Sequence, residues 1–338
     1  MTHTTPDVTT PAGIIRLGNM FCDAKALLTA VELRLFTVLN EKGPSTHEEI
    51  RTALGLHGRG LSDFLNLLTA LGVLERADGG RYRNAPGPDA YLVHGKPGYV
   101  GGFLERANRN LYPAWGRLAE ALRTGQQQSG SDFDQVTQNP HILRQFAGMM
   151  DGLTNVVGPE LAQKYDWSGH GSVLDVGGCR GNLCSLIVKA HPHLTGHVFD
   201  LPAMAPLFEE KVAEHGLTGK VSFTGGSFFE DPLPKADVVV MGHVLHDWDR
   251  EQRAFLVNKA YGAVNPGGTL LIYDRMLEDE PNHIENLVIS LDMLLVTDGG
   301  EEYPISEITA AAKKAGFVNV EAGPFSDYDT LVICRKGA

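Results

Sequence analysis

The chain has 338 residues, of which 43% are hydrophobic and 21% are charged, a length and composition that suit two globular domains with cores of their own. Its net charge of -12 at pH 7 argues against a nucleic-acid partner and against an anionic membrane surface, because both favour a basic face. The four cysteines form no C-x-x-C pair and no apolar run approaches membrane-spanning length, so we expect a cytoplasmic protein with neither a disulfide framework nor a structural metal.

The first predicted element is an apolar helix at residues 14–39, which follows a polar start with neither a signal core nor a transit pattern. Its apolar positions outnumber those that one face of a lone helix can bury, and this surplus indicates an interface. Arg16 is a cation inside the apolar stretch. A dimerising helix could carry Arg16 into the partner's site, where it would bind an acidic acceptor such as an aromatic carboxylate; a surface or interface salt bridge is the simpler alternative.

A helix from residue 45, a second helix at about residues 60–71 and a hairpin at residues 73–82 follow in the order of a winged-helix unit. In a DNA-binding repressor the second helix would be basic, but here it carries mostly apolar side chains and one basic residue, Arg59. DNA binding is therefore disfavoured. Residues 86–97 are rich in proline and glycine, which predicts a linker.

Residues 99–165 return to a helical pattern that a polar stretch at residues 124–131 interrupts. The pattern includes aromatic and Met side chains, among them Phe146, Met149 and Met150. Such stripes pack in a core more often than they line a ligand pocket.

Residues 172–184 predict a strand, a tight loop and a helix, with Asp175 near the end of the strand and three glycines within the next residues. Glycine permits positive φ and places no Cβ between the backbone and a ligand. The spacing Asp-x-Gly-x-x-x-Gly is neither that of dinucleotide binders nor that of a phosphate loop, so the expected ligand lacks a pyrophosphate. The next strand ends in Asp200, whose carboxylate can accept both hydroxyls of a ribose. These features predict a nucleoside site; a tight turn without a ligand is the alternative.

From residue 172 onward, predicted strands and helices alternate, which predicts an α/β fold with a parallel sheet covered on both sides. Further strands are expected at residues 221–224, 236–241, 269–274, 318–320 and 330–334. No helix separates the last two, so we expect the last strand to run antiparallel. Ligands of such sheets bind at the carboxyl ends of the strands, and the polar residues of interest all fall there: Asp175, Asp200, Ser227, His246 and Asp274.

Five motifs in this order resemble those of S-adenosylmethionine-dependent O-methyltransferases of the plant caffeate and flavonoid type and of their bacterial natural-product relatives. The motifs lie at residues 175–181, 200–202, 225–228, 243–248 and 266–268. The resemblance covers nearly the whole chain. It implies a homodimer with a mostly helical, winged-helix-like dimerisation domain at residues 1–98, connecting helices at 99–165 and a Rossmann-like class I methyltransferase domain at 166–338.

The resemblance also implies that S-adenosyl-L-methionine is the cofactor and S-adenosyl-L-homocysteine the product. Carried over residue by residue, it assigns Gly177 to the methionine part of the cofactor, Asp200 to the ribose, and Ser227 with Phe228 to the adenine. The plant enzymes have Asp-Met at the last two positions. A hydroxyl can still meet an adenine nitrogen there, and an aromatic ring can stack on the base.

Three further positions concern the same pocket. Cys179 replaces the third glycine of the loop, which we expect to be tolerated only with a negative φ. Gly242 stands near the cofactor where the plant enzymes have a lysine. Arg144 is a candidate to replace that contact by binding the cofactor carboxylate, and a salt bridge on the helix surface is its alternative role.

Methylation of a hydroxyl needs an oxygen in line with the sulfonium methyl group, so the protein supplies positioning and a proton acceptor. His246 matches the family's general base, and a phenol of pKa ~10 is within reach of a histidine. The resemblance implies that Asp274 and Glu302 support its imidazole, with Glu301 as the neighbouring competitor for the second role. No clustered set of oxygen ligands is apparent, which disfavours a metal-dependent route.

We therefore expect methylation of a phenolic hydroxyl of a small aromatic acceptor, in secondary metabolism such as antibiotic biosynthesis. If the connecting helices face the acceptor, Phe146, Met149 and Met150 become candidate walls of its site. Asn286 and Met293 lie on one face of a later helix and are further candidates. Methyl transfer to nitrogen or to a carboxylate is the alternative chemistry, and a winged-helix regulator that senses the cofactor is an alternative of a different class.

Overall fold

A computed structural model describes residues 6–96, 98–129, 133–281 and 283–338. The contacts within the chain divide it into two compact units, Met1–Tyr112 and Pro113–Ala338. The helices expected to connect two domains, at residues 99–165, therefore lie on both sides of this division. Among the described residues, no helix is long and apolar enough to span a membrane.

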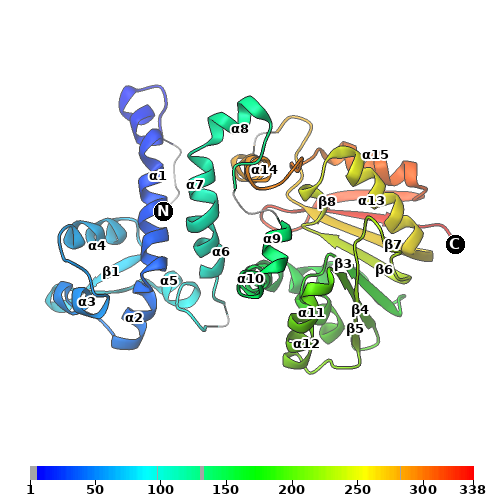
Figure 1. The fold of residues 1–338 in the computed structure, drawn as a ribbon, viewed down its shortest axis with the longest axis horizontal. Helices are drawn as coiled ribbons and strands as arrows, with labels where there is room; N and C mark the ends of the chain where they lie inside the picture. The colour runs from blue at the N-terminus through cyan, green and yellow to red at the C-terminus, as the bar shows by residue number, and fades with distance from the viewer. Residues whose placement is uncertain (1–5, 97, 130–132, 282) are drawn as a thin grey trace. The chain divides into compact units, whose positions relative to one another are not determined.

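The first unit consists of helices and one small hairpin (Figure 1). Its elements are α1 (Pro11–Glu32), α2 (Leu35–Lys42), α3 (His47–Ala53), α4 (Leu61–Ala70), β1 (Leu74–Ala77), β2 (Arg81–Asn84), α5 (Pro86–Tyr91), α6 (Gly101–Arg106) and the π-helical turn η2 (Ala107–Leu111). Its core contains Phe36, Ile50 and Leu65, all fully buried. The predicted order of two helices followed by a hairpin is confirmed: the helices are α3 and α4, and the hairpin is the antiparallel pair β1–β2.

Two predictions for this unit are wrong. The helix expected over residues 14–39 breaks at Arg34, which has φ 59° and separates α1 from α2. The linker expected at residues 86–97 contains α5, because proline is well tolerated in the first turn of a helix, where no hydrogen bond from its nitrogen is needed. Val93, 4% exposed, then packs into the core of the unit, so this segment is part of the fold.

The second unit contains a seven-stranded sheet of order β5-β4-β3-β6-β7-β9-β8. Its strands are β3 (Ser172–Val176), β4 (Thr195–Asp200), β5 (Val221–Gly225), β6 (Ala236–Gly242), β7 (Val264–Asp274), β8 (Asn319–Pro324) and β9 (Thr330–Arg335). The first five are parallel, and β9 runs antiparallel to both β7 and β8. The expected parallel sheet with an antiparallel last strand is confirmed.

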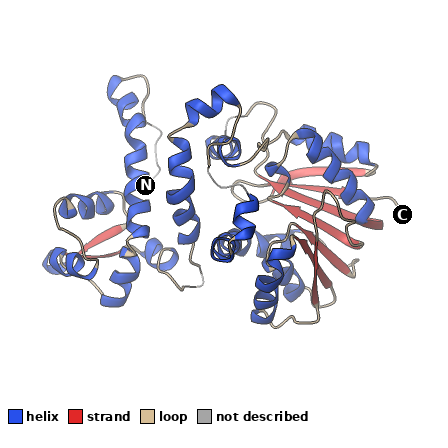
Figure 2. Cartoon of the chain, viewed as in Figure 1, coloured by secondary structure: helices blue, strands red, loops and turns tan. Residues whose placement is uncertain are grey.

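Helices cover both faces of this sheet (Figure 2). One core draws on α10 (Pro140–Lys164), α11 (Asn182–Ala190) and α12 (Ala205–Glu214), and the other on α13 (Arg250–Ala263) and α15 (Ile305–Ala315). The remaining helices from residue 112 onward are α7 (Tyr112–Trp115), which begins at the division between the units, α8 (Leu118–Thr124), α9 (Phe133–Gln138) and α14 (Ile284–Val296). Alternation along β6 separates two cores: Val239 and Met241 pack into one, Val238 and Val240 into the other. Strands buried on both faces read as continuous apolar runs, which is why β6 was predictable.

Candidate active site

The loop between β3 and α11 forms a close backbone turn at the carboxyl end of the sheet. Gly177 and Gly181 have φ of 71° and 80°. A Cβ on Gly177 would lie 2.7 Å from a methyl group of Val244, and one on Gly178 would lie 2.5 Å from the Asp175 carboxylate. The glycines are therefore required by close packing as well as by conformation.

Cys179 has φ 50°, so the negative φ expected there is wrong. The left-handed conformation is unfavourable for a residue with a Cβ and needs support from its surroundings. Here the backbone N–H of Cys179 donates a hydrogen bond to Asp200 Oδ2 at 2.7 Å, which ties the loop to the end of β4.

Two buried carboxylates flank this loop. Burial raises the pKa of Asp175 to about 7, with a contribution from Asp200, and burial raises the pKa of Asp200 to about 6. Asp200 accepts hydrogen bonds from the backbone N–H groups of Cys179 and Leu201, so each of its oxygens keeps one lone pair. Asp175 Oδ2 is buried and has no hydrogen-bond partner among the described residues. A glycine cradle beside polar oxygens that still lack partners fits a nucleoside ligand with an amino-acid tail.

The segment after β5 supplies a hydroxyl and aromatic rings. Ser227 Oγ accepts a long hydrogen bond of 3.3 Å from the Phe229 N–H and keeps its own O–H for another partner. The Phe228 ring packs edge-on against Trp248, with 5.7 Å between ring centroids. Trp248 Nε1 is a buried donor without a partner in the described part of the chain; Trp248 is the last residue of the motif at 243–248, but the sequence predicted no site role for it.

Two residues that were predicted to contact the cofactor, Gly242 and Arg144, have other roles in the structure. A Cβ on Gly242 would lie 1.9 Å from Tyr273 Cζ, so the ring of Tyr273 explains the missing side chain. Arg144 forms a bidentate ion pair with Glu210 at 2.5 and 2.8 Å, and both side chains are exposed. Arg144 therefore forms the salt bridge on the helix surface that was the alternative to binding the cofactor carboxylate.

His246 lies in η4 (Leu245–Asp247), which two residues separate from the end of β6, and its side chain is 12% exposed. Its Nδ1–H donates to Glu302 Oε1 at 2.7 Å, and Asp274 Oδ1 lies 3.8 Å from the same nitrogen. Glu301, the competitor of Glu302, is exposed and pairs with Arg253 at 3.1 Å. The structure thus brings together the three residues predicted to act as a base and its two supporting acids.

The two acids are themselves fixed. Tyr303 donates its O–H to Asp274 Oδ2 at 2.5 Å, and the backbone N–H of Glu302 donates to Ser290 Oγ at 3.3 Å. The remaining oxygens, Asp274 Oδ1 and Glu302 Oε2, are buried without a hydrogen-bond partner among the described residues. The negative charge of the pair is therefore left to interact with the imidazole.

Electrostatics at His246 favour a bound proton. Burial alone would lower the pKa of the imidazole, but the Glu302 and Asp274 carboxylates outweigh burial and raise the pKa above its ordinary value. Burial also raises the pKa of Asp274, and the neighbouring imidazole partly offsets this. An imidazole with these neighbours holds a transferred proton more strongly than free histidine does.

The predicted acceptor walls lie in the second unit and are buried or half-buried. Met149 on α10 is 5% exposed and Met293 on α14 is 8% exposed, and Met150 is partly exposed. Phe146 packs against a small apolar cluster that includes Leu143 and Met204. Asn286 donates to the carbonyls of Met276 and Tyr328 at 3.1 and 3.2 Å, which gives it a structural role. Arg16 belongs to the other unit, where it pairs with Asp23 of its own helix.

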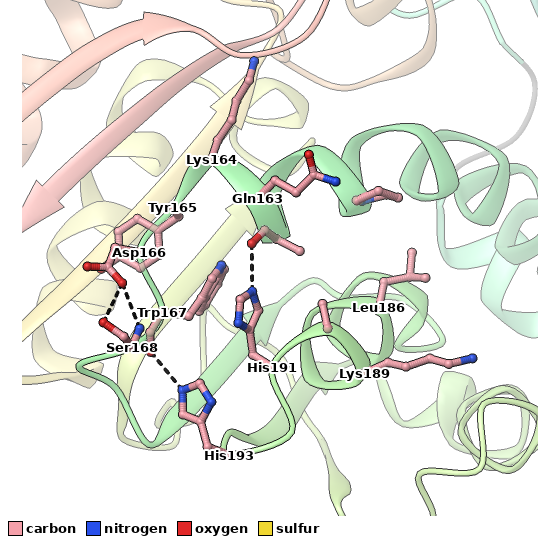
Figure 3. A pocket seen from close by; sticks show the side chains of 13 residues that line it. Gln163, Lys164, Tyr165, Asp166, Trp167, Ser168, Leu186, Lys189, His191 and His193 are labelled. Carbon is pink, nitrogen blue, oxygen red and sulfur yellow. Dashed lines mark hydrogen bonds between the residues drawn. The ribbon is translucent and has the colours of Figure 1, made fainter.

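A surface cavity of about 880 Å³ lies away from these residues (Figure 3). Tyr165, Trp167, His191 and His193 line it, and they precede β3 or β4, at the amino ends of the strands. His191 and His193 are hydrogen-bonded to backbone carbonyls at 2.8 and 3.1 Å, as Figure 3 shows. No predicted site residue lines this cavity, and no group of ligands able to hold a metal ion occurs in the described ranges.

Comparison with known proteins bears on both units. Residues 115–318 match the O-methyltransferase domain family, and residues 15–94 match an O-methyltransferase dimerisation domain. A polyketide 8-O-methyl transferase of tetracenomycin synthesis, TcmO of Streptomyces glaucescens, is 44% identical over 96% of this chain and 97% of its own length. The N,N-dimethyltransferase OxyT of Streptomyces rimosus is 40% identical over 90% of each chain. Human N-acetylserotonin methyltransferase, solved in complex with S-adenosylmethionine, superimposes with a TM-score of 0.90 at 25% identity and full coverage of both chains.

Proposed function

The chain belongs to the S-adenosylmethionine-dependent O-methyltransferases, and from that premise we propose that His246 is the base that assists methyl transfer to a phenolic hydroxyl of a small aromatic natural product. The observation that carries the proposal is the buried imidazole whose Nδ1 lies 2.7 Å from Glu302 and 3.8 Å from Asp274. The tetracenomycin relative, whose name describes O-methylation in polyketide synthesis, supports an aromatic polyketide-like acceptor.

The base would work through one nitrogen. Because Nδ1–H is committed to Glu302, Nε2 is the nitrogen left to accept a proton. S-adenosyl-L-methionine, when bound, supplies a methyl group on a positively charged sulfur that is a strong leaving group. Nε2 would accept the proton of the acceptor O–H as the oxygen takes up the methyl group, and the carbon–sulfur bonding pair would remain on the sulfur of the departing S-adenosyl-L-homocysteine. Glu302 and Asp274 stabilise the imidazolium that results.

For cofactor binding we propose Gly177, Asp200, Ser227 and Phe228, as the resemblance implies. The free lone pairs of Asp200 support a ribose contact, and the buried, unpartnered Asp175 Oδ2 adds an acceptor nearby. The edge-on pair of Phe228 and Trp248 supports an aromatic adenine pocket. For the acceptor, Phe146, Met149, Met150 and Met293 remain the proposed walls.

We also propose a homodimer formed through the first unit. The amino-terminal half of α1 exposes large apolar side chains that are between 40% and 63% accessible: Ile14, Ile15, Leu17, Met20 and Phe21. Such a continuous apolar stripe is typical of an interface. A nucleic-acid partner is not part of the proposal, because α4, the second helix of the winged-helix pattern, contains no Lys or Arg and the chain is acidic.

Methyl transfer to nitrogen is a second candidate, because one of the similar relatives is an N,N-dimethyltransferase. The two chemistries differ in their need for a base, since an amine can attack as its neutral form and lose its proton afterwards. A product analysis that locates the new methyl group on oxygen or on nitrogen separates them.

The test compares the wild type with His246→Ala. Calorimetry should show equal affinity for S-adenosyl-L-homocysteine, and mass spectrometry against naphthols, hydroxynaphthoates and hydroxyanthraquinones should show a methyl-sized gain on a hydroxyl for the wild type alone. A base contributes about 10²- to 10⁴-fold in rate, so the variant should lose at least the lower factor. Full turnover of a phenol by His246→Ala would refute the proposed role.

A further inference from the structure

His243, three residues before the proposed base, adopts an unfavourable backbone conformation. It follows β6 directly, and its φ of 52° makes it one of three non-glycine residues with positive φ in the described part of the chain. A residue with a Cβ keeps such a conformation only where its surroundings hold it in place. The contacts of the His243 side chain show what holds it.

The ring of His243 lies beside that of His246. The two ring centroids are 5.8 Å apart and the planes differ by 20°. Tyr273 of β7 packs edge-on against His243, with a centroid separation of 5.1 Å. The side chain is 10% exposed, so these contacts are shielded from water.

The Nε2 atom of His243 is hydrogen-bonded to the loop between β8 and β9. His243 Nε2 donates to Asp329 Oδ1 at 3.1 Å, and Asp329 Oδ2 accepts from Ser326 Oγ at 2.8 Å. Burial alone would raise the pKa of Asp329, but the hydrogen bond and charge of His243, the hydrogen bond from Ser326 and the charge of Arg275 together outweigh burial, and the pKa is lowered. Asp329 is thus an ionised, 6% exposed carboxylate that fixes the orientation of the His243 ring.

Because Glu302 holds only Nδ1 of His246, one hydrogen bond does not define the plane of that ring. Asp247 Oδ1 lies 3.9 Å from Nε2, which is beyond hydrogen-bond distance, so a ring hydrogen-bonded at Nδ1 can still swing about that contact. We propose that His243, anchored by Asp329, is a positioning residue that fixes the ring plane of His246 and so aims Nε2 at the acceptor hydroxyl. The inference rests on the proposed role of His246 as the base.

The decisive variant is His243→Asn, because asparagine tolerates positive φ and removes the ring. A small misplacement of a reacting group costs up to about 10²-fold, so we expect kcat to fall by about 10- to 100-fold with unchanged affinity for S-adenosyl-L-homocysteine. His243→Gly removes the backbone strain of the positive φ and also lacks the ring, so its kcat should fall as much as that of His243→Asn. His243→Phe keeps a ring at the position and should recover part of kcat, which a purely structural role would not produce.

His191→Asn is the matched control. His191 also has an aromatic neighbour, Trp167 at 5.9 Å, and a hydrogen bond to a carbonyl, but it lies at the opposite end of the sheet. This variant should keep wild-type kcat. Nitrogen-15 NMR of labelled histidine gives a readout that needs no acceptor: the Nδ1–H signal of His246 should exchange with water faster in His243→Asn than in the wild type.

The results separate the inference from its premise. If His246→Ala retains wild-type turnover of the phenol, the base role and the inference fall together. If His246→Ala loses turnover while His243→Asn and His243→Gly keep kcat within about twofold of the wild type and leave the His246 signal unchanged, the inference alone is overturned.

Discussion

Replacing Glu302 by Gln tests the charge that supports His246 while keeping the shape of the side chain. The wild-type hydrogen bond from Nδ1 to Oε1 is 2.7 Å long, buried and charge-assisted. Such a bond contributes about 1.5–3 kcal/mol, which corresponds to about 10- to 150-fold in kcat at one decade per 1.4 kcal/mol. Asp274, 3.8 Å from the same nitrogen, remains in the variant, so we do not expect complete loss.

The sign of the pH effect follows from the same geometry. Glu302 and Asp274 raise the pKa of His246, and the base must be neutral to accept a proton, so the rate falls as the pH falls through that pKa. Loss of the Glu302 charge lowers the pKa of His246 and moves the acid limb of the kcat profile to lower pH. The ratio of wild-type to variant kcat should therefore shrink on acidification.

The assay is kcat against pH for methylation of one phenolic acceptor, with Glu301→Gln as the matched control. Glu301 is the adjacent acid, is exposed and pairs with Arg253, so its variant should keep both kcat and the acid limb. An acid limb that stays in place in Glu302→Gln, or an equal loss in both variants, would refute the assignment of Glu302.

Three further variants test the surroundings of the site. Gly242→Ala places a Cβ 1.9 Å from Tyr273 Cζ, so urea denaturation should show a marked loss of stability; a wild-type midpoint would contradict the packing explanation. Tyr303→Phe removes the donor to the buried Asp274 Oδ2 and should lower the free energy of unfolding by about 1–3 kcal/mol. Urea denaturation measures this loss as well, and an unchanged free energy of unfolding would contradict the role of the Tyr303 hydroxyl. Arg144→Ala breaks only an exposed ion pair, so calorimetry should give an affinity for S-adenosyl-L-homocysteine within about twofold of wild type; a large loss would restore Arg144 as a cofactor ligand.

Local patterns in the sequence predicted the sheet well. The continuous apolar run of β6 and the glycines after β3 are consequences of burial on two faces and of close backbone approach, and both are visible residue by residue. The antiparallel direction of β9 followed from the missing helix before it. The choice of Glu302 over Glu301 depended on the resemblance, because two adjacent acids look alike in composition.

Properties that depend on distant contacts were not predictable in this way. The positive φ of Cys179 depends on a hydrogen bond to Asp200, 21 residues away. The pairing of His243 with Asp329 spans 86 residues. The proline-rich segment of α5 has the composition of a linker, and no residue of the helix is buried; only the packing of Val93, which follows the helix, into the core shows that the segment is part of the first unit.

The register of the sheet explains why these distant residues meet. In β6 and β7 Gly242 pairs with Tyr273, so the next residues, His243 just after β6 and Asp274 at the end of β7, lie at the same edge of the sheet. In β7 and β9 Asp274 pairs with Thr330, and because β9 runs antiparallel, the residue before Thr330 enters at that edge too. That residue is Asp329. A parallel last strand would have placed its first residue at the opposite edge, so the reversal of β9 is what brings a carboxylate to His243.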